Sequence, residues 1–503
     1  MQPILDSCQR FLACAVTCCA ALAIGSGIGA AEPPSADGAA ALLALEQSVV
    51  DAIARGEKSV VAVARVRRST EGDSQDSSTL LRFPLSANPL FDSSPLSPDF
   101  VPNDFGAGVV IDAAGLVLTN YHVLGDAQQS DFYVWSQRQP YKATVLSADP
   151  WYDLAVLRVD AQDLVPITFG DAKQLRKGQF VIALGNPYAI ARDGEVSASW
   201  GIVANLLRRA PRMSGRAGEP LGNDTLHHYG TLIQTDARLN LGYSGGALLN
   251  LRGEMVGLTT SYAASADYAA AAGFAVPVDA QFLQAVDVLK RGGRPAFGFL
   301  GVGTELLPES HQRSGRHGVR VVSVVDATPA TRGGVQVGDV ITHINQEPVY
   351  AVADLFRIVG AEPAGTAATV TVSRGGDDAR EAQTVQLQVQ LTKKYVSSAR
   401  TPIGREDLAE WRGMKVDDAS ASPSFSVLGP HLDPQGCVYV AEVAQDSPAW
   451  KAGLRPGVYV SHAEGTSVTS PAAFLAATAA ASGAVELVVL SGQDPPTRQT
   501  VSP

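Results

Sequence analysis

Residues 106–123 read "GAGVVIDAAGLVLTNYHV", two short apolar runs separated by a turn that contains a glycine. Both runs are rich in valine, leucine and isoleucine and are too short for a typical helix, so the stretch predicts two short β-strands. Similar short runs bounded by glycine continue from Phe105 to Val278 without long intervening helices. This pattern is typical of an all-β barrel or sandwich.

The segments that flank this β-rich region carry other patterns. Residues 38–68 predict a short helix followed by a strand, and residues 278–293 predict a helix that ends in basic residues and two glycines. Residues 69–104 are rich in serine, proline and aspartate and predict a long loop. These signals delimit a β-rich domain that ends near residue 293.

The C-terminal third of the chain contains an internal repeat. Residues 329–349, "PATRGGVQVGDVITHINQEPV", align without gaps on residues 448–468, "PAWKAGLRPGVYVSHAEGTSV", at a constant offset of 119. Each copy follows a strand-like run and precedes a helix-like run and a further strand. A period this long predicts two tandem domains of about 90 residues rather than a solenoid of short repeats.

Composition narrows the class of protein. The 503 residues are 46% hydrophobic and 18% charged, which indicates a globular chain of about three domains. The net charge of −11 argues against a general binder of nucleic acid or of anionic membranes. One basic cluster, at residues 208–218, lacks interleaved aromatic residues and is interpreted as a solvated loop, with a regulatory contact as the alternative.

The N-terminus has the pattern of a secretory signal. An apolar stretch over residues 11–31 ends in the small residues Gly29 and Ala31, which precede a possible cleavage site before Glu32. The first residues carry little net positive charge, so an uncleaved membrane anchor is the alternative.

Cysteine usage excludes two kinds of stabilisation. Four of the five cysteines lie in the first 19 residues, and only Cys437 would remain after cleavage. The mature chain can therefore form neither an internal disulfide nor a cysteine-based zinc site, and we expect no metal or cofactor.

A serine with the surroundings of a nucleophile lies in residues 239–250, "LNLGYSGGALLN". On this stretch alone the interpretation of Ser244 as a turn residue is favoured, because a serine nucleophile also needs a base and an acid that orients the base. His122 follows a predicted strand and is the candidate base, and Asp153 precedes the apolar run "LAVLRV" and is the candidate acid. Their order along the chain is the chymotrypsin order.

The glycines around Ser244 suit the formation of an oxyanion hole. The backbone N–H groups of Gly242 and Ser244 can converge on a developing oxyanion if the turn takes a strained shape. Glycine at positions 242, 245 and 246 lowers the steric cost of that shape. We therefore expect Gly242 and Ser244 to form the oxyanion hole.

These motifs together resemble the HtrA (Deg) family of trypsin-like serine endopeptidases. The resemblance is carried by "GAGVVIDAAGLVLTNYHV", "DPWYDLAVLRVD", "IQTDARLNLGYSGGALLNLRGEMVGLTT" and "GFAVPVD", and by the repeat, which is similar to the PDZ domains of the family. It implies a mostly β fold, with a chymotrypsin-like double β-barrel followed by two PDZ domains. The implied divisions are residues 1–31 (signal or anchor), 32–104 (N-terminal segment and long loop), 105–293 (protease), 294–392 (first PDZ), 393–404 (linker) and 405–492 (divergent second PDZ).

The resemblance also implies binding residues and exposes departures. It places the PDZ carboxylate-binding loop at Leu300, Gly301 and Val302. The implied substrate pocket is formed by Arg238, Tyr243, Leu258 and Thr259. The family usually has asparagine where this chain has Tyr121 and Tyr243, and both tyrosines are expected to reshape the rim of the active site. Arg238 stands where the family commonly has a small residue, which weakens the inference of the family's small-aliphatic cleavage preference.

The function that the resemblance implies is ATP-independent cleavage of unfolded or misfolded proteins outside the cytoplasm, with the periplasm as the expected compartment. PDZ domains would bind peptide C-termini and regulate activity, and the implied assembly is a homotrimer or larger. Neither nucleic acid nor a cofactor is expected, and a membrane is a partner only if the N-terminal segment stays uncleaved. The competing hypothesis is a non-enzymatic chaperone or scaffold that has kept the protease fold.

Overall fold

A computed structural model of the protein describes residues 36–68, 102, 104–186, 195–210, 225–260, 272–375, 382–396, 401–479, 481–492 and 495–503. The chain divides into two compact units, residues 1–50 and 51–503. The expected signal or anchor at residues 1–31, and nearly all of the expected loop at 69–104, lie outside the described residues. No helix in the described part of the chain is long and apolar enough to span a membrane.

A closed β-barrel follows the first helix, α2 (Ala36–Gly56). Its strands neighbour one another in the order β1-β2-β3-β6-β5-β4. Their bounds are β1 (Val60–Arg67), β2 (Asp104–Asp112), β3 (Leu116–Asn120), β4 (Ser130–Ser136), β5 (Gln139–Asp149) and β6 (Leu154–Val159). The stretch quoted first forms the two predicted strands, β2 and β3, which pair as an antiparallel hairpin, and the short helix α3 (Tyr121–Leu124) follows directly. Apolar side chains such as Val63, Val117 and Leu157 fill the interior.

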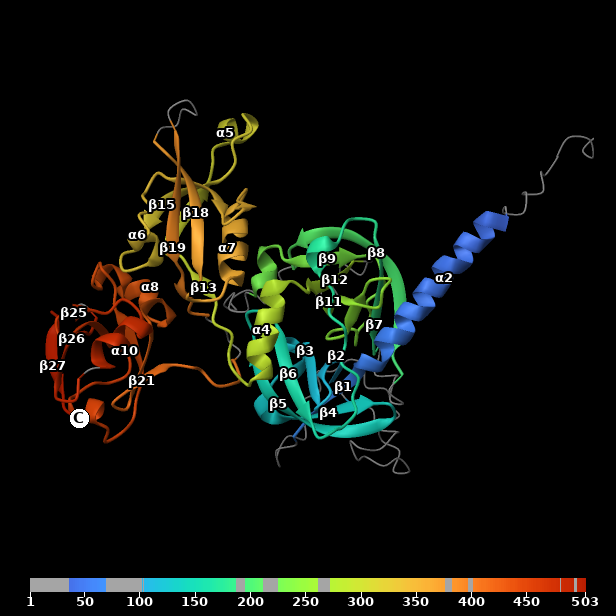
Figure 1. The fold of residues 1–503 in the computed structure, drawn as a ribbon, viewed down its shortest axis with the longest axis horizontal. Coiled ribbons are helices and arrows are strands. Elements are labelled where there is room, and N and C mark those ends of the chain that lie inside the picture. The colour runs from blue at the N-terminus through green and yellow to red at the C-terminus, as the bar shows by residue number, and fades with distance from the viewer. Residues whose placement is uncertain are drawn as a thin grey trace, which may run out of the picture. The chain divides into compact units, whose positions relative to one another are not determined.

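A second closed barrel has the neighbour order β10-β11-β12-β9-β8-β7. Its strands are β7 (Phe180–Gly185), β8 (Ser197–Arg208), β9 (Leu232–Thr235), β10 (Ala247–Leu249), β11 (Met255–Thr260) and β12 (Gly273–Pro277), and the one-turn helix η6 (Leu226–Tyr229) precedes β9. The predicted helix is α4 (Ala280–Lys290), which begins where the Asp279 side chain accepts a hydrogen bond from the Phe282 N–H. It runs beside β5 and β6 of the first barrel (Figure 1) and buries Phe282, Val286 and Leu289.

The two copies of the repeat form two sheets of the same arrangement. The first has the order β14-β15-β16-β18-β19, with β17 beside β16. The second has the order β21-β22-β23-β24-β26-β27, with β25 beside β24, so each strand of the first sheet has a counterpart. The first-copy strands are β13 (Gly298–Phe299), β14 (Val302–Leu306), β15 (Val319–Val324), β16 (Val340–Ile344), β17 (Glu347–Pro348), β18 (Ala367–Arg374), β19 (Gln383–Gln390) and β20 (Thr392–Lys393).

The second-copy strands are β21 (Ala409–Trp411), β22 (Met414–Asp418), β23 (Val438–Val443), β24 (Tyr459–Ala463), β25 (Thr466–Ser467), β26 (Val485–Leu490) and β27 (Thr497–Val501). The helices of the first copy are α5 (Glu309–Arg313), α6 (Pro329–Arg332) and α7 (Val352–Ala361). Those of the second are α8 (Phe425–Leu428), α9 (Pro448–Lys451) and α10 (Pro471–Ala479). Each sheet has its own apolar core, so the repeat corresponds to two separately packed domains, drawn in yellow to orange and in red in Figure 1.

Candidate active site

His122 and Asp153 are joined by two hydrogen bonds. The Nδ1 atom of His122 lies 2.8 Å from Asp153 Oδ2, and the backbone N–H of His122 donates to Asp153 Oδ1 over 3.0 Å. Because a carboxylate only accepts, Nδ1 carries the proton in a neutral imidazole, which leaves Nε2 able to accept one. This tautomer is the one that a general base acting through Nε2 requires.

The charge state of Asp153 follows from its surroundings. Its side chain is buried, and burial alone would raise the pKa of the carboxyl group. The electrostatic effect of His122 and its hydrogen bonds to the carboxylate lower the pKa by more, so the pKa lies below its ordinary value. Asp153 is therefore ionised at neutral pH and can stabilise an imidazolium at His122.

Strand pairing places these two residues. Asn120, the last residue of β3, pairs with Leu154, the first residue of β6, so the end of one strand lies opposite the start of the other. Asp153 has a left-handed backbone conformation, with φ of 55°. That conformation is costly for an aspartate. Two hydrogen bonds to the Asp153 carbonyl stabilise this conformation, one from the Tyr121 N–H over 3.0 Å and one from the Asn120 side-chain amide over 3.2 Å.

The turn that carries Ser244 depends on its glycines. Gly242 and Gly245 have φ values of 100° and 86°, in the region that favours glycine. A Cβ atom at Gly242 would lie 2.1 Å from the Asn186 carbonyl oxygen, and one at Gly245 would lie 2.1 Å from the Ala107 carbonyl oxygen. No other residue type therefore fits at either position without moving the backbone.

The turn that carries Ser244 lies against the first barrel, close to α3, the helix that carries His122. The Ala107 N–H in β2 donates to the Ser244 carbonyl over 2.8 Å. A Cβ atom at the neighbouring Gly106 would lie 2.9 Å from Val123 in α3 and 3.0 Å from the Ser244 carbonyl oxygen. The structure thus brings the serine turn and the His122–Asp153 pair together where the two barrels meet.

The two unusual tyrosines do not lie on the rim, and that expectation is wrong. Tyr243 is 3% exposed and packs in the core of the second barrel, where Gly185 lacks the side chain that would collide with its ring. Its hydroxyl donates to the Ser197 carbonyl over 3.3 Å. Tyr121 is 5% exposed and packs in the core of the first barrel. Sequence position beside a catalytic residue does not reveal which way such a ring points.

The other expected pocket residues occupy different environments. Leu258 and Thr259 are fully buried in β11, and the Thr259 hydroxyl donates to the Tyr243 carbonyl. The Arg238 side chain is exposed, while its carbonyl accepts from the Ser199 hydroxyl over 2.8 Å.

A buried histidine lies beside the loop that carries Asp153. His227 in η6 is fully buried, with Nε2 2.9 Å from the Tyr152 carbonyl and Nδ1 2.7 Å from the Thr231 hydroxyl. The carbonyl only accepts, so Nε2 carries the proton and Nδ1 accepts from Thr231. Burial lowers the pKa of His227 to about 4, so His227 is neutral at neutral pH. In this form it donates to the carbonyl of Tyr152, the residue before Asp153.

His227 predicts an acid-dependent loss of stability. Its pKa falls from 6.5 to about 4 on folding, so the unfolded chain binds more protons between these values. This contribution to stability is present above pH 6.5 and is lost as pH falls toward 4. His227→Gln keeps a donor and an acceptor but does not titrate. When pH falls from 7.5 to 5, we therefore expect the free energy of unfolding of the variant to rise by about 2 kcal/mol relative to that of the wild type.

Urea unfolding of both proteins at the two pH values measures this difference. Asp149 nearby has a pKa raised to about 7, chiefly by burial, and shifts stability in the opposite sense. Because both proteins contain Asp149, its contribution cancels in the comparison. An unchanged difference between the proteins at pH 7.5 and pH 5 would contradict the prediction.

The residues expected to form the peptide-binding loop lie directly before and at the start of β14 in the first repeat domain. Gly301 has φ of 90°, and its carbonyl accepts from the Val325 N–H over 3.0 Å. The Leu300 side chain is buried, and its carbonyl accepts from the Ala330 N–H over 2.8 Å. Val302 begins β14, the edge strand of its sheet, which is the position at which a peptide can add as a further strand.

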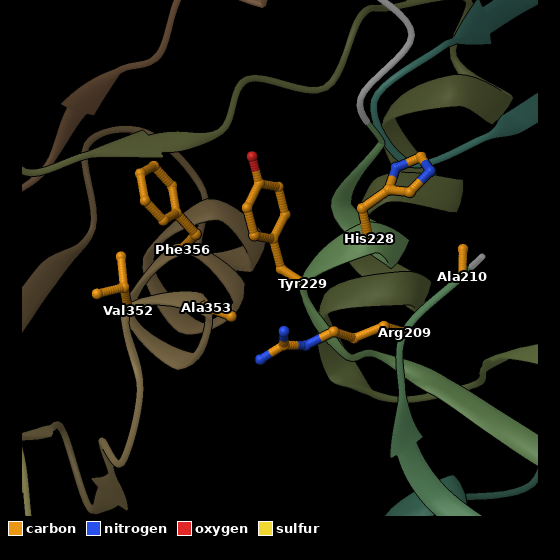
Figure 2. Close-up of a pocket in the computed structure, with 7 residues that line it drawn as sticks. All are labelled: Arg209, Ala210, His228, Tyr229, Val352, Ala353 and Phe356. Carbon is orange, nitrogen blue, oxygen red and sulfur yellow. The ribbon is translucent and has the colours of Figure 1, made fainter. Parts of the chain in front are cut away.

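A pocket of about 350 Å³ lies away from the three candidate catalytic residues (Figure 2). Arg209, Ala210, His228 and Tyr229 line one side, and Val352, Ala353 and Phe356 of α7 line the other. The rings of Tyr229 and Phe356 stack at 5.1 Å, and the Trp151 indole donates to the Gly360 carbonyl over 3.1 Å. The first repeat domain therefore contacts the protease beside η6. No group of three histidine, cysteine or acidic residues that could hold a metal occurs among the described residues.

Comparison with known proteins gives consistent matches. The family model described as "Trypsin-like peptidase domain" matches residues 106–258, and the one described as "PDZ domain" matches residues 298–390. A "Probable periplasmic serine endoprotease DegP-like" of Pseudomonas putida is 33% identical over 376 residues, covering 73% of this chain and 72% of that protein. The "Periplasmic serine endoprotease DegP" of Salmonella typhimurium is 32% identical over 358 residues, covering 70% and 67%.

Solved structures include the HtrA-type protease AlgW with a decapeptide. It is 25% identical, with a TM-score of 0.47, and the match covers 69% of this chain and 98% of that chain.

Proposed function

Because the chain belongs to the HtrA (Deg) family of serine endoproteases, we propose that His122, Asp153 and Ser244 are its catalytic triad. The chain is a periplasmic serine-type endopeptidase of protein quality control, with a trypsin-like protease domain and a PDZ domain. The observation on which the triad rests is the doubly hydrogen-bonded pair of His122 and Asp153 beside a serine turn that only glycine at positions 242 and 245 allows.

The geometry supports acyl transfer through a covalent intermediate. Nε2 of His122 takes the hydroxyl proton of Ser244 while Oγ attacks the peptide carbonyl, and Asp153 stabilises the imidazolium that results. The imidazolium then returns the proton to the leaving amine, and water hydrolyses the acyl-enzyme by the same steps. The N–H groups of Gly242 and Ser244 bind the oxyanion. The positive φ values of Gly242 and Gly245 in this turn support that role.

The residues proposed to recognise substrate follow from the family to which the chain belongs. Arg238, Leu258, Thr259 and the main chain of Tyr243 border the substrate pocket, and Leu300, Gly301 and Val302 bind a peptide C-terminus. Unfolded and misfolded polypeptides are the proposed substrates. The second repeat domain is proposed to be a divergent PDZ domain, because its strand order reproduces that of the first. A homotrimer or larger assembly, a cleaved signal or N-terminal anchor, and a role in stress response complete the proposal.

Covalent labelling tests the triad. We expect a fluorophosphonate probe to label the full-length protein, and peptide mapping by mass spectrometry to find the adduct on Ser244. The reaction needs both an activated hydroxyl and an oxyanion site, so the adduct reports catalytic geometry rather than exposure. Labelling of another serine, or none in the presence of an unfolded polypeptide, would overturn the assignment.

A further inference from the structure

Residues 401–405, between the two repeat domains, pair with the protease domain; we call this segment the strap. Ala148 in β5 donates to the Ile403 carbonyl over 2.7 Å, and Ile403 donates back to the Ala148 carbonyl over 2.9 Å. The Ile403 side chain packs against the apolar core of the first barrel. The strap therefore extends the barrel by one antiparallel bridge.

A second set of contacts fixes the far end of the strap. The Arg405 N–H donates to the Gly292 carbonyl over 2.8 Å, and the Arg405 carbonyl accepts from the Arg294 N–H over 3.0 Å. Between the two anchor points, Gly404 has φ of 132°, and a Cβ atom there would lie 3.0 Å from the carbonyl oxygens of both Gly292 and Gly293. Position 404 therefore favours glycine, because other residues rarely adopt this φ and because a Cβ atom there would press on both carbonyls.

One side chain connects the strap to the triad. Tyr121 donates its hydroxyl to the Thr401 carbonyl over 3.0 Å, while its backbone N–H donates to the Asp153 carbonyl over 3.0 Å. It is also the residue before His122 and the first residue of α3. Its ring and the Ile403 side chain belong to the same apolar core. A single tyrosine therefore contacts the strap at one end and the carbonyl of a triad residue at the other.

We propose that Tyr121 is a positioning residue through which the docked strap holds His122 and Asp153 in their catalytic arrangement. The proposal rests on the triad assigned above. A hydroxyl bonded to a backbone carbonyl fixes the ring in one position, and the ring fixes the start of α3. Small displacements of a catalytic base reduce rate more than binding. Undocking the strap is thus expected to lower kcat and to leave KM for a short peptide nearly unchanged.

Two substitutions separate this role from packing alone. Tyr121→Phe keeps the ring in the core and removes the hydroxyl that donates to the Thr401 carbonyl. Gly404→Ala introduces a Cβ atom against the Gly292 and Gly293 carbonyls and undocks the strap without touching the triad. Gly457→Ala is the matched control, because Gly457 also has a positive φ, 101°, but a Cβ there meets nothing within 4 Å.

The measurements are kcat and KM for a short fluorogenic peptide and the rate of fluorophosphonate inactivation, all on the full chain. We expect Tyr121→Phe and Gly404→Ala each to lower kcat and the inactivation rate by about 3- to 10-fold. The double variant should be no slower than the slower single variant, because both changes break the same connection. KM should stay within about twofold in every case, and Gly457→Ala should match wild type.

Unchanged kcat in Tyr121→Phe, or effects that multiply in the double variant, would overturn the proposal. If Gly404→Ala does not fold, Ile403→Ala replaces it, because it removes the apolar anchor of the strap. A wild-type protein that is not labelled at Ser244 would instead contradict the triad and this proposal together. A labelled enzyme with unchanged kcat in the variants contradicts this proposal alone.

Discussion

Ser244→Ala is expected to lower kcat for an unfolded polypeptide by about five to six orders of magnitude. The substitution removes the attacking oxygen, without which the covalent intermediate cannot form at this position. The turn itself should persist, because the Ser244 carbonyl still accepts from the Ala107 N–H and the flanking glycines are unchanged. Single-turnover cleavage of a labelled unfolded protein measures the loss.

Binding provides the control for this variant. Removal of one hydroxyl leaves the proposed substrate pocket and the peptide-binding loop intact, so affinity for the same unfolded protein should stay within about threefold. Fluorescence anisotropy measures that affinity without turnover. Cleavage retained at a tenth of the wild-type rate would show that another nucleophile acts, and the proposed triad would then be wrong.

Asp153→Asn is expected to lower kcat by about four orders of magnitude with little change in fold. Asp153 Oδ1 accepts from the His122 N–H, so the amide oxygen of asparagine takes that position and its NH₂ faces Nδ1. Nδ1 must then accept, which moves the imidazole proton to Nε2. His122 can no longer receive the Ser244 proton, and the base is lost without removal of the histidine.

Asp149→Asn is the matched control, because it changes a second buried carboxylate of the same loop. Asp149 Oδ1 accepts from the Tyr152 N–H over 2.7 Å, a bond that the amide oxygen of asparagine can keep. Its pKa of about 7 means that the neutral form is already substantially populated at neutral pH. We expect kcat within about threefold of wild type. Equal losses in the two variants would mean that the loop, not the tautomer, is what Asp153 supports.

Local sequence patterns predicted much of this protein. The apolar runs after Phe105 became the strands of two barrels, and the repeat at offset 119 became two sheets of matching order. Asp153 was found because it stands at the start of an apolar run, which is β6. Such features depend on neighbouring residues, which a sequence shows directly.

Features that depend on distant partners were not predicted. Nothing near Tyr121 indicates that its hydroxyl reaches Thr401, because the two residues are 280 positions apart. His227 stands in a polar stretch, but it is buried and contacts Tyr152, whose ring lies 5.8 Å away and whose carbonyl lies 2.9 Å from Nε2. The direction of a side chain and the identity of its partner are set by tertiary packing, which local periodicity does not encode.

The docked strap also limits the reach of the last domain. Only four peptide bonds separate Arg405, fixed to the protease, from Ala409 at the start of β21, a span of at most about 14 Å. The first repeat domain also holds the last domain, because the Phe299 and Phe425 rings lie 5.8 Å apart and the Lys393 N–H donates to Asp418 Oδ2 over 2.8 Å. Release of the strap would leave the last domain attached through the first repeat domain alone, so its attachment and the rate of the active site would change in a single event.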